Sequence, residues 1–329
     1  MKIYYETIKQ DAPCCVALGF FDGVHTGHRA LLGAMNSYAT SHDLNSCVFT
    51  FSHSPCALLG KKESRALQTL PQRLSDIEEF SGAQCCYAVD FWKYREMSAE
   101  NFVFDILVKT LNVRAVFCGF NFRFGKGASG DTSTLKNMLT PLGIEVFVIA
   151  PVCSSGETVS SSRIRRLIEN GEMMSANSML AHPFCISGEV VHGKQNGRTV
   201  GIPTINQSLP EGFVIPKMGA YASFAVISKT RIRAVTNIGL RPTISSNNTI
   251  NCETHLLDDF SGDLYGEDIS TELLWFEREE RKFDDLNALA KQIRFDINHI
   301  TELNIYERYL AAGNVINLSF QYASGGKPF

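Results

Sequence analysis

Residues 16–39 read VALGFFDGVHTGHRALLGAMNSYA, and this stretch decides which fold the first half of the chain can adopt. The apolar run Val16–Phe21 is typical of a buried strand, and it ends in a turn bounded by glycines. Residues 28–39 have the apolar spacing of a helix, with one face formed by Leu31, Leu32, Met35 and Tyr38. A strand that passes through a short turn into a helix predicts the start of a βαβ unit.

The same alternation continues to about residue 150. Cys47–Phe51, Val113–Cys118 and Ile144–Ile149 are β-rich runs, and Asn101–Leu111 carries apolar residues at helical spacing. Strands that alternate with helices form a parallel sheet covered by helices on both faces. We therefore expect an α/β domain of the Rossmann-like kind over residues 1–182.

The pattern changes after Gly171. Between Phe184 and Phe276, short β-branched and aromatic runs are separated by Gly, Pro and Asn, which predicts an antiparallel barrel or sandwich. Asp284 or Asp285 then caps a helix whose apolar residues predict one buried stripe: Leu286, Leu289, Ile293, Ile297 and Ile300. These patterns place a second domain at residues 183–312 and a loose tail at residues 313–329.

Composition excludes several classes of protein. Lys plus Arg number 31 and Asp plus Glu 34, a net charge of −3, whereas proteins that bind nucleic acid through its phosphates are usually strongly basic. Apolar runs fall far short of the ~20 residues that span a bilayer, and residues 1–11 lack the apolar core of a secretory signal. The 10 cysteines form no C-x-x-C or zinc pattern. We expect a cytoplasmic protein with reduced, mostly buried thiols.

The turn Gly19-Phe-Phe-Asp-Gly-Val-His-Thr-Gly-His28 is the sharpest chemical signal in the sequence. His25 and His28 flank a glycine at the start of a helix, where imidazoles and free backbone N–H groups can surround one anion. Such a site can hold a triphosphate and stabilise charge that develops on a phosphorus under attack. The alternative is a turn whose histidines only cap the helix.

A second helix start, Val159-Ser-Ser-Ser-Arg-Ile-Arg165, combines hydroxyl groups with arginines. Serines at this position are usually caps, but beside the histidine turn they favour phosphate binding. Gly125-Lys-Gly-Ala-Ser-Gly130 matches G-x-G-x-x-G, yet it does not directly follow its strand, so we interpret it as a glycine loop and not as a dinucleotide site.

The second half contains another glycine-rich candidate, GKQNGRTVGIPTIN, at residues 193–206. Thr204 and Asn206 alternate along an extended segment, so both side chains face the same way, and their oxygens suit Mg²⁺ bound to a nucleotide. Glu253 lies in another strand-like run and can act as a general base on a substrate hydroxyl. Taken alone, the first stretch could be a hairpin with exposed polar residues, and Glu253 could be a solvated strand residue.

Together these segments resemble the prokaryotic bifunctional riboflavin kinase/FAD synthetase family from about residue 10 to about residue 310. The matching stretches occur in the family's order: GFFDGVHTGH, CGFNFRFGKGASGD, VSSSRIR, GKQNGRTVGIPTIN, NIGLRPT, ETHLLDDFSGDLYG and REERKF. The resemblance implies a nucleotidyltransferase-type α/β domain for FMN adenylylation, followed by a split-barrel riboflavin kinase domain. Ile205 and His182 depart from the residues common in the family.

The resemblance also implies a role for each matching position. In the first domain, the residues for ATP are Gly19, Phe20, Phe21, Asp22, Gly23, His25, His28, Asn121, Ser161, Ser162 and Arg165, with His25 and His28 stabilising the transition state. In the kinase domain, Gly193, Gly197, Thr204 and Asn206 would bind Mg–ATP, Glu253 would be the base, and Arg278 and Glu280 would border the flavin.

We therefore expect two ATP- and Mg²⁺-dependent reactions, riboflavin to FMN and FMN to FAD, with riboflavin, FMN, FAD and ATP as the partners and no nucleic acid or membrane. The alternatives are a family member that retains one activity, or an inactive flavin-binding regulator. The two histidines and Glu253 argue against a regulator, because binding alone needs no base.

Overall fold

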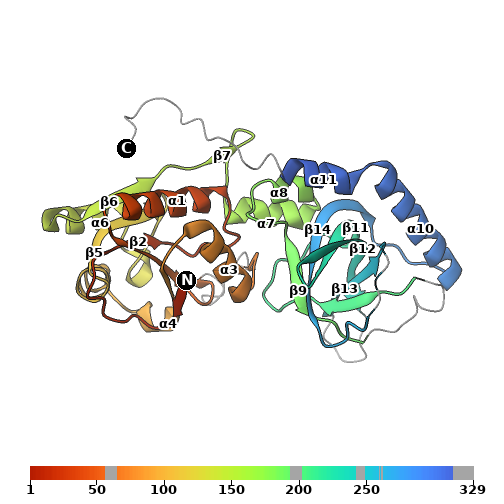
Figure 1. Ribbon diagram of the computed structural model, residues 1–329, viewed down its shortest axis with the longest axis horizontal. Coiled ribbons are helices and arrows are strands. Elements are labelled where there is room, and N and C mark those ends of the chain that lie inside the picture. The colour runs from red at the N-terminus through yellow and green to blue at the C-terminus, as the bar shows by residue number, and fades with distance from the viewer. Residues whose placement is uncertain (56–64, 193–201, 242–248, 259, 261, 314–329) are drawn as a thin grey trace. The chain divides into compact units, whose positions relative to one another are not determined.

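The computed structural model describes the chain except for residues 56–64, 193–201, 242–248, 259, 261 and 314–329. Contacts divide the chain into two compact units (Figure 1). The first comprises Met1–Phe184 together with Pro210–Pro216, and the second comprises Cys185–Leu209 and the residues from Lys217 onward. Each unit has its own six-stranded sheet.

The sheet of the first unit is entirely parallel, as the alternating pattern predicts. Its strands lie in the order β1-β4-β3-β2-β5-β6. They are β1 (Lys2–Tyr4), β2 (Cys14–Leu18), β3 (Asn45–Phe51), β4 (Cys85–Val89), β5 (Val113–Gly119) and β6 (Glu145–Ile149). Strands β1 and β4 were not among the predicted elements, although all five residues of β4 are buried, as expected for an inner strand.

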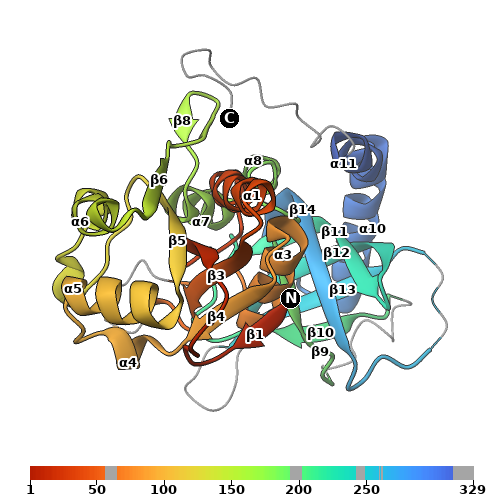
Figure 2. The ribbon, with the colours of Figure 1, turned by 60° about the vertical axis from the view of Figure 1, so that its left-hand side comes forward.

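Helices cover both faces of this sheet (Figure 2). Helices α1 (Thr26–Ser41) and α3 (Leu70–Ser81) pack on one face. A π-helical stretch, η1 (Phe102–Thr110), and α6 (Thr132–Leu139) pack on the other. The remaining helices of the unit are α4 (Phe91–Tyr94), α5 (Ala99–Asn101), α7 (Ser161–Asn170) and α8 (Met173–Asn177), and a hairpin joins β7 (Cys153–Ser154) to β8 (Glu157–Thr158).

Strand alternation explains the adjacent cysteine pairs. In β2, Cys14 belongs to the core on one face of the sheet and Cys15 to the core on the other, because successive side chains of a strand point in opposite directions. Cys85 and Cys86 divide in the same way. All cysteines in the described part of the chain are free, and burial raises the pKa of the Cys15 and Cys86 thiols to about 12.

The order of the strands defines where a ligand can bind. The chain runs from β2 to β3 on one side and later places β5 on the other side of β2. Leu18 and Cys118 pair at the carboxyl ends of β2 and β5. In open parallel sheets, ligands bind beyond the carboxyl ends of the strands at the point where the order reverses. The residues that follow Leu18 and Cys118 therefore lie at the expected binding edge.

The second unit is an antiparallel, nearly closed barrel, which confirms the split-barrel prediction. Its strands lie in the order β10-β13-β12-β11-β14-β9. They are β9 (Cys185–Glu189), β10 (Ile205–Ser208), β11 (Gly219–Ile227), β12 (Thr230–Arg241), β13 (Thr249–Leu256) and β14 (Asp268–Glu279). A bridge between Val191 and Asn206 links the two edges of the sheet.

Two helices follow the barrel, α10 (Leu286–Glu302) and α11 (Ile305–Gly313). Asp285 caps α10, as predicted, and its side chain accepts a hydrogen bond from Ala288 N. The predicted buried stripe is wrong in part: Leu286 is 39% exposed, and of the five stripe residues only Ile300 is fully buried. The reason is that the helix also buries Asp296, whose carboxylate pairs with Arg278 on β14.

No helix within the described ranges is both long enough and apolar enough to span a bilayer.

Candidate active sites

The turn between β2 and α1 has an unusual backbone. Gly23 has a φ of 82°, and two residues with side chains, Phe21 and Val24, also have positive φ values of 59° and 34°. Such conformations cost about 1–3 kcal/mol at a residue with a side chain and are found mainly where function requires them. The turn ends at His25, the N-cap of α1, whose Nδ1 accepts a hydrogen bond from His28 N at 3.3 Å.

The two histidine rings stack on each other, with their centroids 3.6 Å apart. His25 is buried, and its desolvation lowers its pKa to about 4. Desolvation also holds the pKa of His28 well below its ordinary value. Both imidazoles are therefore neutral at pH 7. Because Nδ1 of His25 accepts a hydrogen bond, the proton of its neutral ring is assigned to Nε2.

The first turn of α1 contains three buried side-chain atoms that have no hydrogen-bond partner within the described residues: Thr26 Oγ1, His28 Nδ1 and Arg29 Nε. Buried polar atoms are nearly always paired in native proteins, so three orphans in one helical turn indicate a missing ligand. Free backbone N–H groups and the helix dipole favour an anion at this position.

Asp22 connects this turn to the second predicted phosphate segment. Its carboxylate accepts hydrogen bonds from Leu67 N at 3.0 and 3.2 Å and forms an ion pair with Arg165 at 2.5 Å. Ser161 Oγ donates to the Asp22 carbonyl at 2.9 Å. Burial raises the pKa of the Asp22 carboxyl, and the Arg165 guanidinium works against that rise. Asp22 therefore holds the start of α7 against the histidine turn.

The other predicted residues, Phe20, Gly19, Asn121 and Ser162, differ in what they contact, and Phe20 packs against an arginine that the sequence did not predict. Arg73 lies over the Phe20 ring, 4.1 Å from its centroid, and donates to two carbonyls at the end of β3. Gly19 is packed beneath the Phe21 ring, which a Cβ atom would meet at 2.8 Å. Asn121 follows β5 and is exposed, as is Ser162. The structure thus brings most of the predicted residues to the edge where the strand order reverses.

The predicted kinase residues meet on neighbouring strands of the barrel. Asn206 on β10 pairs directly with Glu253 on β13. Asn251, two residues before Glu253, donates from Nδ2 to Asn206 Oδ1 at 3.1 Å and to Glu253 Oε1 at 2.9 Å. Glu253 is exposed, whereas both asparagines are buried. Thr204 lies just before β10 and is partly exposed. Gly193 and Gly197 lie outside the described residues.

The oxygens of this cluster fit a magnesium ion. Mg²⁺ takes hard oxygen ligands and commonly uses only one or two protein groups beside water and phosphate oxygens. Thr204 offers a hydroxyl, and Asn206 offers an amide oxygen, which has two lone pairs. The hydrogen bond from Asn251 occupies one of those lone pairs and leaves the other for a cation.

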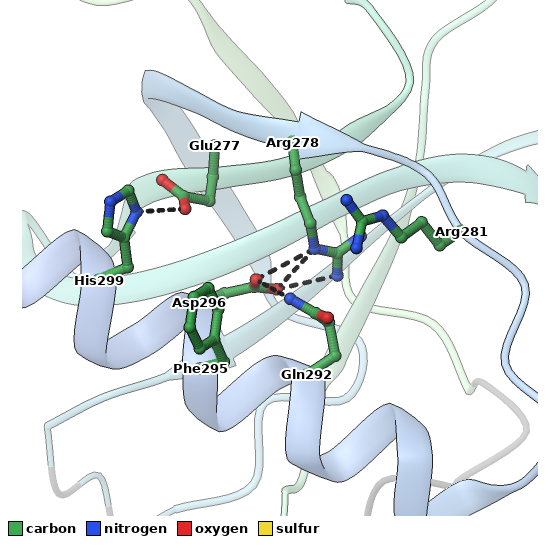
Figure 3. Close-up of a pocket in the computed structure, with 7 residues that line it drawn as sticks. All are labelled: Glu277, Arg278, Arg281, Gln292, Phe295, Asp296 and His299. Carbon is green, nitrogen blue, oxygen red and sulfur yellow. Dashed lines mark hydrogen bonds and ion pairs between the residues drawn. The ribbon is translucent and has the colours of Figure 1, made fainter.

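A cavity of about 490 Å³ lies between the end of β14 and helix α10 (Figure 3). Arg278 turns toward α10, where its Nε donates to both carboxylate oxygens of Asp296 at 3.0 Å and its Nη2 forms an ion pair with Asp296 Oδ2 at 2.8 Å. His299 contacts Glu277 at 2.6 Å, and Glu277 Oε2 is buried with no partner among the described residues. Glu280 is placed differently, over the backbone of Gly239 on β12. The two predicted flavin residues therefore face different strands and helices.

Comparison with known proteins assigns the family. Residues 7–163 match the family model described as FAD synthetase, and residues 180–304 match the model described as riboflavin kinase. The chain is 36% identical to the bifunctional riboflavin kinase/FMN adenylyltransferase of Escherichia coli (strain K12), over 86% of this chain and 90% of that protein. The chain belongs to the bifunctional riboflavin kinase/FMN adenylyltransferase family.

A second member of the family is similarly related to the chain, and one solved structure shares its fold. The riboflavin kinase/FMN adenylyltransferase of Bacillus subtilis (strain 168) is 33% identical, over 89% of this chain and 93% of that protein. A crystal structure from Streptococcus pneumoniae, described as a macrolide-efflux protein, has 29% identity and a TM-score of 0.79, and covers 90% of this chain and 95% of its own. That likeness extends over both units.

Sequence reasoning missed several residues that contact the candidate site residues in the structure. Arg73 and Leu67 hold the histidine turn through contacts across the fold, which no local pattern reveals. Asn251 did carry a signal, because it lies two positions before Glu253 and so shares its face of β13. Thr26 and Arg29 also lie inside the quoted turn and helix, beside the two histidines.

Proposed function

We propose that the chain phosphorylates riboflavin with ATP to give FMN in its second unit, and transfers AMP from ATP to FMN to give FAD in its first unit. One observation carries this proposal: each polar cluster lies within the stretch matched by its own family model. The histidine turn and Ser161 fall in the FAD synthetase match, and Asn206 and Glu253 fall in the riboflavin kinase match.

In the kinase reaction, the Glu253 carboxylate accepts the proton of the terminal ribityl hydroxyl as the hydroxyl oxygen attacks the γ-phosphorus of ATP. The bond from that phosphorus to the bridging oxygen breaks, and ADP leaves with the electron pair. The exposure of Glu253 supports this role, because the carboxylate is open to a substrate. Thr204 and Asn206 would hold Mg²⁺ together with the nucleotide, and the ion would neutralise charge on the phosphoryl oxygens.

In the adenylyltransferase reaction, an oxygen of the FMN phosphate attacks the α-phosphorus of ATP, and pyrophosphate leaves. No base is needed, because the attacking phosphate is already ionised. His25 and His28 donate hydrogen bonds to the phosphate oxygens, and the start of α1 supplies backbone N–H groups. Ser161 and Ser162, at the start of α7, bind the phosphates of ATP. Asn121 contacts the nucleotide or the flavin. Arg165 reaches the phosphates from its position beside Asp22.

We place the domain boundary at residues 182/183, with the adenylyltransferase at 1–182, the kinase at 183–312 and a tail at 313–329. The division of contacts after Phe184 supports this boundary. In the kinase unit, Arg278 and Glu280 border the flavin, and Gly193 and Gly197 contact ATP. A cytoplasmic location is supported by the free state of the cysteines in the described ranges.

A pair of substitutions tests the assignment of the two reactions. His28→Ala is expected to lower FAD formation from FMN about a hundredfold, because one transition-state contact of this kind is worth about 3 kcal/mol. Glu253→Gln is expected to lower the turnover of riboflavin about 10²–10⁴-fold, because Gln preserves the shape but accepts no proton. Chromatography of FMN and FAD after incubation with ATP and Mg²⁺ gives both rates for each variant.

Each variant serves as the control for the other. His28→Ala should leave riboflavin phosphorylation near the wild-type rate, and Glu253→Gln should leave the conversion of FMN to FAD intact. If either variant lowers both rates equally, the two sites are not independent. Wild-type protein that forms neither product would support the alternative of an inactive flavin-binding regulator, and protein that forms one product would show that a single activity is retained.

A further inference from the structure

Asn251 is the one buried side chain that joins the predicted nucleotide residue Asn206 to the predicted base Glu253 in the described part of the barrel. It is 7% exposed, and Nδ2 lies 3.1 Å from Asn206 Oδ1 and 2.9 Å from Glu253 Oε1. The sheet register explains the arrangement, because Asn206 pairs with Glu253 and Ser208 pairs with Asn251. All four side chains therefore lie on the same face of the β10–β13 pair.

The chemistry of the Asn251 amide matches this position. An NH₂ group has two hydrogens, so one nitrogen can donate to both oxygens. The opposite orientation of the amide would place an oxygen against a carboxylate and against another amide oxygen, with no hydrogen between them. The Glu253 carboxylate and the Asn206 oxygen therefore determine that the Asn251 NH₂ group faces them. The two hydrogen bonds in turn hold both oxygens in place.

The neighbours of Asn251 along the strand have a different role. Cys252 and Thr254 point to the opposite face of β13 and are buried. There Thr254 joins a chain of hydroxyls inside the barrel, with Thr236 at 2.8 Å and Thr271 at 3.5 Å. The hydrogen bonds of the Asn251 side chain, within the residues that the structure describes, go only to Asn206 and Glu253. Its position serves the surface cluster and not the barrel interior.

We propose that Asn251 is a positioning residue of the kinase site, which holds the Glu253 carboxylate and the Asn206 amide oxygen at a fixed separation. This inference rests on the proposed kinase function. A carboxylate on an exposed strand position can adopt several rotamers, and only some of them point an oxygen at a substrate hydroxyl. Donation from a buried amide selects one rotamer, and the same bond orients the Asn206 oxygen, as outer partners do for the ligands of a bound cation.

Two variants and one matched control test this role. Asn251→Asp preserves size but replaces the donor nitrogen by an acceptor oxygen, and Asn251→Ala removes the side chain. Ser208→Ala is the control, because Ser208 lies opposite Asn251 on the same face and is exposed. For each protein we would measure kcat and KM for riboflavin, the rate of FAD formation from FMN, and the binding of Mn²⁺ in the presence of ADP by electron paramagnetic resonance.

Both Asn251 variants are expected to lower the kinase kcat by ~10–100-fold, the usual range for loss of a residue that orients another, with the KM for riboflavin within about threefold of wild type. In both Asn251 variants, the affinity for Mn²⁺ in the presence of ADP should be lower than in Ser208→Ala, by up to about tenfold. FAD formation from FMN should be unchanged. Kinase turnover equal to that of Ser208→Ala, or an equal loss of both activities, would overturn the proposal.

A double variant separates this proposal from the assignment of the base. If Asn251 acts through Glu253, adding Asn251→Ala to Glu253→Gln should lower the kinase kcat much less than Asn251→Ala lowers it in the wild-type protein. The reason is that the effects of coupled residues are non-additive. Losses that multiply would overturn the role of Asn251. Glu253→Gln with wild-type turnover would instead overturn the proposed base, whereas an impaired Glu253→Gln beside unimpaired Asn251 variants would overturn only the positioning role.

Discussion

The charge state of the histidine pair determines how the turn at α1 treats a phosphate group. Burial keeps His25 and His28 neutral at pH 7, so in the free protein they are hydrogen-bond donors and not cations. The sequence predicted both residues, because H-x-G-H at a helix start is a local pattern. It did not predict that Arg165 would be paired with Asp22, 143 positions away, since that contact depends on how α7 packs.

The pKa of His25 predicts how stability depends on pH. Folding lowers this pKa from 6.5 to about 4, so below pH 6.5 the unfolded chain binds a proton that the folded chain does not. The free energy of unfolding should therefore fall as the pH drops from about 6.5 to about 4, by up to about 3 kcal/mol from this residue. Above pH 7 the histidine contributes no pH dependence.

The substitution His25→Asn isolates the contribution of His25 to the pH dependence of stability, because Asn is a good N-cap but does not titrate. The sequence has two tryptophans, and Trp275→Phe leaves Trp92 to report on the first unit. In that background, urea unfolding at pH 7.5 and pH 5 should show a smaller loss of stability for His25→Asn than for His25. An equal loss in the two proteins would contradict the pKa assigned to His25.

At the scale of elements, a side chain of an edge strand adds to the backbone bridge between Val191 and Asn206 in closing the barrel. Gln207 on β10 is fully buried and donates to Gly188 O on β9 at 3.0 Å and to Ile269 O on β14 at 2.9 Å. It also accepts from Thr271 at 2.7 Å. The strands themselves were readable from β-branched runs, but this closure was not, since nothing local marks a glutamine as a link between distant strands.

In helix α10 the sequence predicted more burial of apolar side chains than the structure shows. Its apolar spacing predicted a continuous stripe, yet the helix buries Asp296 against Arg278, and Leu286 at its start is exposed. Periodicity finds the helix and its cap correctly, because both depend on neighbouring residues. It misplaces part of the buried face, because an arginine on β14 makes a buried carboxylate favourable there.

Gln207→Ala should destabilise the second unit by about 2–4 kcal/mol, because it removes three hydrogen bonds of a buried side chain, each worth ~1 kcal/mol. Trp92→Phe leaves Trp275 as the reporter for this unit, and urea unfolding then gives the change. Ser208→Ala, at the next and exposed position, is the control and should change stability by less than about 0.5 kcal/mol. A Gln207→Ala protein as stable as that control would show that closure does not depend on this residue.

At the scale of the whole molecule, the change from alternating strands and helices to short β runs predicted two kinds of sheet, and both are present. The sequence could not show that contacts group Pro210–Pro216, which lies between two barrel strands, with the first unit. Phe213 and Val214 in this segment are buried, and Phe213 contacts Phe184 with the ring centroids 5.4 Å apart. A segment that is distant in sequence thus becomes part of the first unit.

This grouping sharpens the test of the domain boundary. We expect a fragment of residues 184–329 to make FMN and never FAD, because it retains the barrel, Asn206 and Glu253 but lacks the stretch that matches FAD synthetase. Phe213 and Val214 would lose part of their buried environment in the fragment, so a second version with Phe213→Ser and Val214→Ser should be more soluble with the same kinase turnover. Circular dichroism shows whether each fragment is folded, and chromatography shows whether it forms FMN or FAD. A fragment that forms FAD would contradict the assignment of adenylyl transfer to the first unit. Two fragments that are both unfolded would show that the kinase is not an independent unit beginning near residue 184.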